Sequence, residues 1–205
     1  MKNKLLARNT YTSLLYQVVT VACGFVLPKL ILVHYGTAVN GLVNSITQFL
    51  GLITYLDLGI SAVVQSALYK PLAEKNNKNI SEIISSARKF FKTIARILAV
   101  YVVILIFIYP FIIQNSEFDI VYTGTLIVAI SISSFAQYYF GITDQLLISA
   151  DQRVYIPYML QIITLIVNTI ACAILMSLGH SIQLVKFDNF PDFFSTPTLL
   201  QNLCE

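Results

Sequence analysis

The chain has 205 residues, of which 57% are hydrophobic and 11% charged, with a mean hydropathy of +0.74 and a formal net charge of +3. A composition this apolar along the whole length excludes an ordinary water-soluble domain. Apolar segments recur from end to end, so a single cleaved signal peptide does not account for them either. The sequence therefore predicts an all-α fold, a polytopic membrane helical bundle.

The cysteines and the basic residues argue against two other kinds of site. Cys23, Cys172 and Cys204 are scattered and show neither CxxC nor Cys/His spacing, so neither a metal nor a cofactor is expected. Lysines and arginines gather at the ends of apolar segments rather than on a soluble module. Nucleic acid is therefore not an expected partner.

The first predicted span runs from about Tyr11 to Val33 and follows a basic N-terminus. Gly24 and Pro28 lie within it and favour a kink. Lys29 comes near its far end, where the ammonium group either extends to the interface or turns into the bundle to meet an anion. A short connection from Tyr35 leads to the next span.

The second predicted span, Asn40 to Pro71, is the most informative segment. Asp57 is its only charged residue between Gly41 and Leu68, a stretch longer than the roughly 20 residues that cross a hydrocarbon core. At 100° per residue Asn44 and Gln48 share a polar face, which predicts a helix that lines a cavity. An acid at membrane depth is costly, so Asp57 is expected to face water or the bundle interior. The alternatives are that it pairs with a neighbouring helix or lies near an interface.

The longest polar connection follows, from Pro71 to Asn79. Asn79 and Glu82 have the spacing of a capping box, so a helix is expected to restart there and to continue into a third span, about Thr93 to Gln114. Three basic residues at intervals of four form a predicted cytoplasmic basic rim: Arg88, Lys92 and Arg96. The rim either contacts anionic lipid or a pyrophosphate headgroup, or only sets the topology.

Two further spans are predicted at about Ile120 to Leu147 and Tyr155 to Leu178, each with a polar stripe on one side. The candidate cavity-lining residues in these stripes are Gln137, Asp144 and Asn168. Polar side chains in such stripes also serve as hydrogen-bonding contacts between helices, and this alternative stays open.

The distribution of charge predicts the topology and the domain boundaries. Lysines and arginines fall mostly on one side of the predicted spans, which places the N-terminus in the cytoplasm. Residues 1–180 are expected to form a transmembrane bundle of about five helices. Residues 181–205 read as an atypical polar tail, a truncated or frameshifted sixth helix, because charges and prolines interrupt it.

Four strings carry a family resemblance: YQVVTVACGFVLPKLILVHYG, NGLVNSITQFLGLITYLDLGI, QSALYKPLAE and LLISADQRVYIPY. Over about Arg8 to Lys186 the chain resembles the N-terminal half of Wzx-type polysaccharide flippases. These belong to the multidrug/oligosaccharidyl-lipid/polysaccharide (MOP) exporter superfamily, which includes the MATE exporters. The resemblance implies one lobe of a MOP/MATE-like transporter in the bacterial inner membrane. Its substrate would be undecaprenyl-pyrophosphate-linked oligosaccharide, flipped during O-antigen or capsule biosynthesis.

The resemblance also implies roles for two residues and a set of partners. Lys29 matches a basic position that would meet the pyrophosphate, and Asp57 an acidic position that would take part in ion coupling or hold Lys29. The coupling ion stays unidentified. The partners would be the lipid-linked oligosaccharide, membrane lipids, and a second lobe or a second copy of the chain.

Two alternatives to transport remain at this stage. The residues after Lys186 no longer resemble the family, and alternating access needs two lobes, so the chain alone is expected to be inactive. An inactive truncated membrane fragment is therefore one alternative. An integral-membrane glycan-modifying enzyme is the other, but His34 and His180 are isolated and no acid pair is visible, so an enzyme is not expected.

Overall fold

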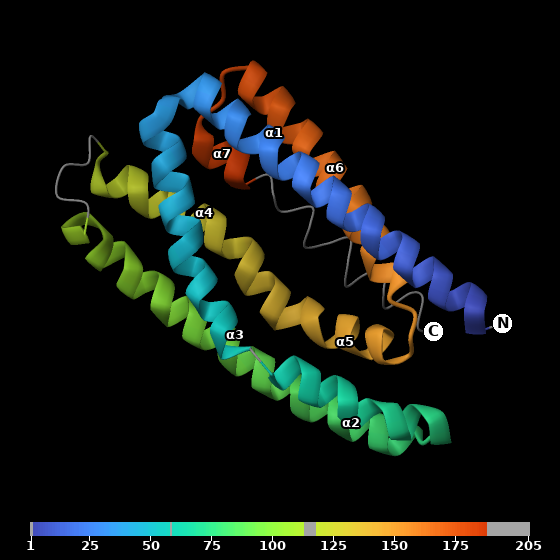
Figure 1. Ribbon diagram of the computed structural model, residues 1–205. Helices are drawn as coiled ribbons and strands as arrows, with labels where there is room; N and C mark the ends of the chain where they lie inside the picture. Colours follow the sequence, from blue (N-terminus) through green and yellow to red (C-terminus); the bar gives the residue numbers. More distant parts are fainter. Residues whose placement is uncertain (1, 58, 113–117, 188–205) are drawn as a thin grey trace.

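The computed structural model describes residues 2–57, 59–112 and 118–187, and within these ranges the chain is helical without a β-strand. The all-α prediction is confirmed (Figure 1). The α-helices are α1 (Lys2–Gly51), α2 (Ile60–Glu74), α3 (Asn77–Ile112), α4 (Ile120–Ala136), α5 (Ile142–Ala150), α6 (Tyr155–Ser177) and α7 (Ile182–Phe187). A 3-10 helix, η1 (Leu52–Leu56), follows α1, and a π-helix, η2 (Gln137–Gly141), joins α4 to α5.

Four helical segments of the described chain are long and apolar enough to cross a membrane. They are Lys4–Gly51, Asn77–Tyr109, Ile120–Ala150 and Tyr155–Ser177. This agrees with the predicted membrane character of the chain.

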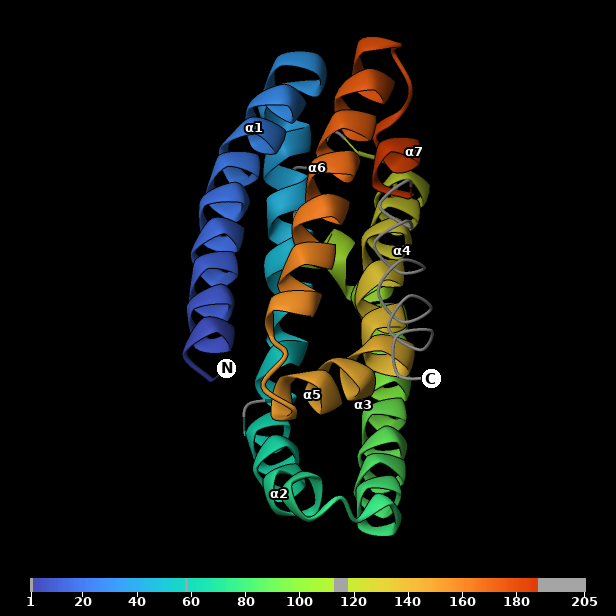
Figure 2. The same cartoon turned by 90° about the vertical axis from the view of Figure 1, so that its right-hand side faces the viewer.

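The first of these segments contains two passes of the chain. Gly36, with φ 83° and ψ 178°, is the one non-helical residue inside α1, and the chain reverses its direction there (Figures 1 and 2). A residue with a side chain is strained in this conformation, which glycine adopts readily. The helix continues through Gly24 and Pro28, so the break lies after the kink that these two residues predict.

The predicted second span is not one continuous helix. It ends at Gly51, passes through η1 and restarts at Ile60, after Gly59 with φ 113°. Asp57 stabilises the restart, because its backbone carbonyl accepts the Ile60 N–H (3.1 Å) and its Oδ1 accepts the Ser61 hydroxyl (2.7 Å). The hydrophobic pattern does not predict this interruption, because the interruption depends on backbone conformation and on a local side-chain hydrogen bond.

The predicted capping box at Asn79 is wrong. Helix α3 begins at Asn77, and the side chain that caps it is Asn76, whose Oδ1 accepts the Asn79 N–H at 3.2 Å. Lys75, with φ 53°, ends α2 in the left-handed conformation and donates its N–H to the Leu72 carbonyl. This tight termination leaves only two residues between the helices, so the restart falls earlier than the sequence pattern indicates.

Helix α3 is the longest helix without an internal break among the described residues. Its 36 residues span about 54 Å at 1.5 Å each, well beyond a hydrocarbon core of about 30 Å. Helix α2 runs beside its first half, and the two extend past the rest of the bundle at one end (Figure 2).

The core lies where the second half of α1 meets α3, α4 and α6. Tyr101 of α3 donates its hydroxyl to the Phe49 carbonyl at 2.9 Å, and Tyr109 packs edge-to-face on the Phe49 ring at 6.0 Å. These contacts fix α3 against the second pass of α1.

The connections sort to the two ends of the bundle (Figures 1 and 2). The N-terminus, the α2–α3 turn and the α5–α6 turn lie at one end, called here the basic end. The Gly36 turn and the α6–α7 connection lie at the other. Helix α7, which falls within the predicted tail, packs on α4 and α6 with Ile182 and Val185 buried. The rest of the predicted tail lies outside the described residues.

Candidate functional site

The charged candidates collect at one level of the bundle. Counted from Gly36, from the last residue of α3 and from the first residue of α4, they are Asp57, Lys92 and Asp144 at 21, 20 and 24 residues along their passes. Lys92 is thus about 30 Å from the end of α3, a distance close to the thickness of a hydrocarbon core.

An ion pair links α3 to α5 at this level. The Arg88 Nη2 and the Asp144 Oδ1 are 3.2 Å apart, with the Arg88 side chain 46% exposed and the Asp144 side chain 17% exposed. A mostly buried carboxylate requires a partner, and the guanidinium supplies a charge-assisted hydrogen bond. Four of the five guanidinium N–H groups are left for another acceptor.

Lys92 lies one helical turn further along α3. Its ammonium nitrogen is 5.0 Å from the centre of the Tyr139 ring in η2, within the range of a cation–π contact. Arg96 is turned toward its own helix, where its Nη2 donates to the Thr93 hydroxyl at 3.0 Å. The predicted rim is therefore unequal: Arg88 and Lys92 face α5 and η2, whereas Arg96 does not.

Asp57 lies close enough to the same irregular segment to interact with it electrostatically. Its half-buried carboxylate lies within electrostatic range of Tyr138, a buried residue of η2. The two interruptions of regular helix, η1 with Gly59 and η2, thus lie at one level. π-Helical turns inside α-helices occur frequently at functional sites. We call Asp57, Arg88, Lys92, Tyr139 and Asp144 the interfacial cluster.

The structure does not bring Lys29 to this cluster. Lys29 is exposed and lies 7 residues from Gly36, about 10 Å from that end, whereas Asp57 lies about 31 Å from it. A difference in depth of about 20 Å excludes an ion pair between them in this structure. The expectation that Asp57 holds Lys29 is therefore wrong for this structure. The sequence pattern did not indicate how far along the bundle each residue lies.

The amide candidates divide by exposure. Asn44, Gln48 and Gln137 are exposed. Asn168 is buried, and its Oδ1 accepts from the Cys172 thiol at 3.5 Å within α6. Its environment is that of a packing residue.

Sequence reasoning missed two contributions. Tyr139 is one, because its contact with Lys92 joins residues on separate helices. Asn9 is the other: it bridges the first helix to the α5–α6 turn more than 140 residues away. Neither leaves a periodic signal in the sequence.

Among the described residues, no group of three His, Cys, Asp or Glu side chains is placed to hold a metal ion. Neither a protein-family model, nor a curated protein, nor a solved structure matches this chain. The feature of the structure that bears on function is therefore the interfacial cluster.

Proposed function

We propose that the chain forms one lobe of a flippase that moves undecaprenyl-pyrophosphate-linked oligosaccharide across the bacterial inner membrane during polysaccharide biosynthesis. The observation that carries the proposal is the pair of cations, Arg88 and Lys92, at the interface level on the α3 face toward α5 and η2. A lipid-linked pyrophosphate places its negative charges at the headgroup level. Cations at that depth are positioned to receive it.

The chemistry of the two cations fits a diphosphate. Arginine offers a planar set of N–H donors that matches phosphate oxygens, and lysine adds a compact point charge. Asp144 orients the Arg88 guanidinium and keeps part of its charge neutralised until an anion arrives. The contact between Lys92 and the Tyr139 ring holds the ammonium group near the same place.

The direction of transport follows from the proposed topology. The basic end carries the lysines and arginines of the N-terminus, of the α2–α3 turn and of the α5–α6 turn. The positive-inside rule places that end in the cytoplasm, with several passes of the chain through the inner membrane. The interfacial cluster then faces the leaflet in which the lipid-linked units are assembled. A second lobe, or a second copy of this chain, is the proposed partner for alternating access.

Ligand-induced thermal stabilisation of the detergent-purified chain tests the proposal. Undecaprenyl diphosphate should raise the unfolding midpoint more than phosphatidylglycerol at the same concentration, because only the state with the formed site binds it. The double variant Arg88→Gln/Lys92→Gln should lose this difference. Lys78→Gln removes an exposed charge from the start of α3 and should retain it. Equal stabilisation by the two lipids would contradict the diphosphate site.

A further inference from the structure

A groove runs along the side of α3 that carries Arg96. It has a volume of about 420 Å³, and the described residues that line it are Thr93, Arg96, Ile97, Val100, Tyr101 and Ile104. Their spacings of three and four place them on one side of the helix. The groove is polar at its Arg96 end and apolar from there to Ile104, a distance of about 12 Å along the helix.

The guanidinium of Arg96 is held at the polar end of the groove by its own helix. Its Nη2 donates to the Thr93 hydroxyl at 3.0 Å, and its Nε donates to the Lys92 carbonyl at 3.4 Å. The Thr93 hydroxyl in turn donates to the Lys89 carbonyl at 3.0 Å, which fixes the oxygen that receives the guanidinium. These bonds use two of the five guanidinium N–H groups and leave three for another acceptor.

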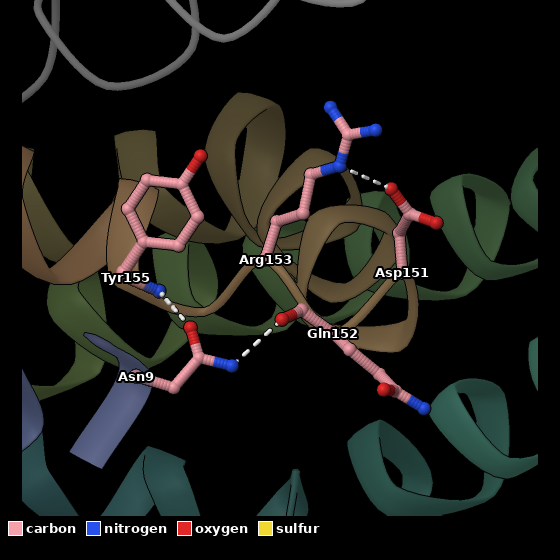
Figure 3. Close-up of polar contacts among 5 residues, drawn as sticks. All are labelled: Asn9, Asp151, Gln152, Arg153 and Tyr155. Carbon is pink, nitrogen blue, oxygen red and sulfur yellow. Dashed lines mark hydrogen bonds and ion pairs between the residues drawn. The ribbon is translucent and has the colours of Figure 1, made fainter. Parts of the chain in front are cut away.

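Arg96 differs from the other arginines of the chain in what lies beside it. Arg88 pairs with a carboxylate of α5, and Arg153 pairs with Asp151 at 2.8 Å (Figure 3). The guanidinium carbon of Arg8 lies 3.3 Å from the centre of an aromatic ring. Within the described part of the chain, Arg96 has neither a carboxylate at ion-pair distance nor a ring beneath it. Its charge is therefore available to an anion outside the chain.

Arg96 also lies where α3 changes from polar to apolar. The helix carries several charged side chains up to Arg96, whereas residues 97–112 carry none. An apolar run of about 24 Å is suited to the hydrocarbon of a membrane, and a long cationic side chain at its border reaches the lipid phosphates. The groove leads from this border along the apolar half, which is the direction that an acyl chain takes from its headgroup.

We propose that this groove binds an anionic glycerophospholipid of the surrounding membrane, with its phosphate on Arg96 and one acyl chain along Ile97, Val100 and Ile104. The planar guanidinium offers paired N–H donors to the phosphate oxygens. A net negative lipid is preferred over a zwitterionic one, because a choline group offsets the phosphate charge that Arg96 meets. The site stands apart from the interfacial cluster, and the proposal holds whether or not that cluster binds a diphosphate.

Fluorescence quenching in reconstituted vesicles tests the lipid site, because the chain contains no tryptophan. A tryptophan replaces Phe107, an exposed residue one turn beyond the Ile104 end of the groove. Phosphatidylglycerol or phosphatidylcholine with a brominated acyl chain is the quencher, at increasing fractions of the vesicle lipid. The binding constant at this tryptophan should favour phosphatidylglycerol about fivefold. A reference tryptophan at the exposed Val167, in the uncharged helix α6, should show no preference.

Arg96→Gln in the Phe107→Trp chain should abolish the preference. Lys78→Gln is the matched control, because it removes one charge from α3 about 27 Å from Arg96 and should leave the preference unchanged. A Phe107→Trp chain without any preference would overturn the proposal, and this measurement needs no Arg96 variant to fold. So would a preference that survives Arg96→Gln, an equal loss in Lys78→Gln, or an equal preference at Val167. Weak quenching by both lipids would also overturn it, and is the result expected if a second lobe or a second copy of the chain covers the groove.

Discussion

Arg88 and Asp144 depend on each other unequally. The Asp144 side chain is 17% exposed and keeps little water, whereas the Arg88 side chain is 46% exposed and remains partly hydrated. Removing the arginine leaves a mostly buried carboxylate without its cation, which is more costly than removing the acid from a hydrated guanidinium. The ion pair is thus both a link between α3 and α5 and a constraint on any change at the proposed diphosphate site.

We predict that Arg88→Ala lowers the free energy of unfolding in detergent by about 1 to 2 kcal/mol, and that Asp144→Asn lowers it by less. The double variant should be close to Asp144→Asn, because the carboxylate that made Arg88 necessary is gone. Denaturant titrations of the three variants in one detergent measure these differences. Additive losses in the double variant would show that the pair is not coupled.

At the level of the elements, periodicity and hydropathy predicted the spans but not where they break. The apolar segments were recognisable because each is marked by its own hydrophobic residues. Helices α4 and α6 begin at the residues where their apolar segments begin. The interruption at η1 and Gly59 has no such mark, since it depends on one left-handed glycine and on the Asp57–Ser61 bond. The sequence could suggest Asp57 as important but could not show that it stabilises the start of α2.

The candidate site was predictable to the same limited extent. Arg88 and Lys92 were identifiable from their spacing of four on one helix. Their partners Asp144 and Tyr139 were not, because each contact joins residues about 50 positions apart whose relative depth depends on where every helix turns. The position of the Gly36 turn likewise determines that Lys29 and Asp57 lie at different levels of the bundle, and the sequence pattern does not give that position.

Gly36 offers a direct test of the turn that defines the two passes of α1. Its φ of 83° with ψ of 178° is a conformation that costs a residue with a side chain about 1 to 3 kcal/mol. We predict that Gly36→Ala lowers the free energy of unfolding by an amount in that range. Gly41→Ala is the control, because Gly41 is inside the helix and a Cβ added there would meet no atom within 4 Å, so alanine should be neutral or stabilising. Thermal unfolding of both variants measures these differences. If Gly36→Ala is as stable as the parent chain, the turn does not lie at Gly36.

For the whole molecule, the sorting of the connections links the fold to the membrane. The α2–α3 and α5–α6 turns share the basic end with the N-terminus, and the Gly36 turn and the α6–α7 connection share the other (Figure 1). Two turns separated by an even number of passes lie on the same side of the membrane, and two separated by an odd number lie on opposite sides. The side of every turn is therefore fixed once the side of one is known. The excess of lysine and arginine at the basic end favours the cytoplasm for that end.

Labelling with a membrane-impermeant maleimide in intact cells tests this orientation. In a cysteine-free background, single cysteines replace three exposed residues at the two ends: Lys75, Arg153 and Ser181. Ser181→Cys should react in intact cells whose outer membrane has been permeabilised, whereas Lys75→Cys and Arg153→Cys should react only after the inner membrane is opened. Because the α2–α3 and α5–α6 turns lie at one end of a single bundle, Lys75→Cys and Arg153→Cys must behave alike. Reaction of both from outside would invert the molecule and place the interfacial cluster in the other leaflet, while a difference between them would contradict the arrangement of the helices itself.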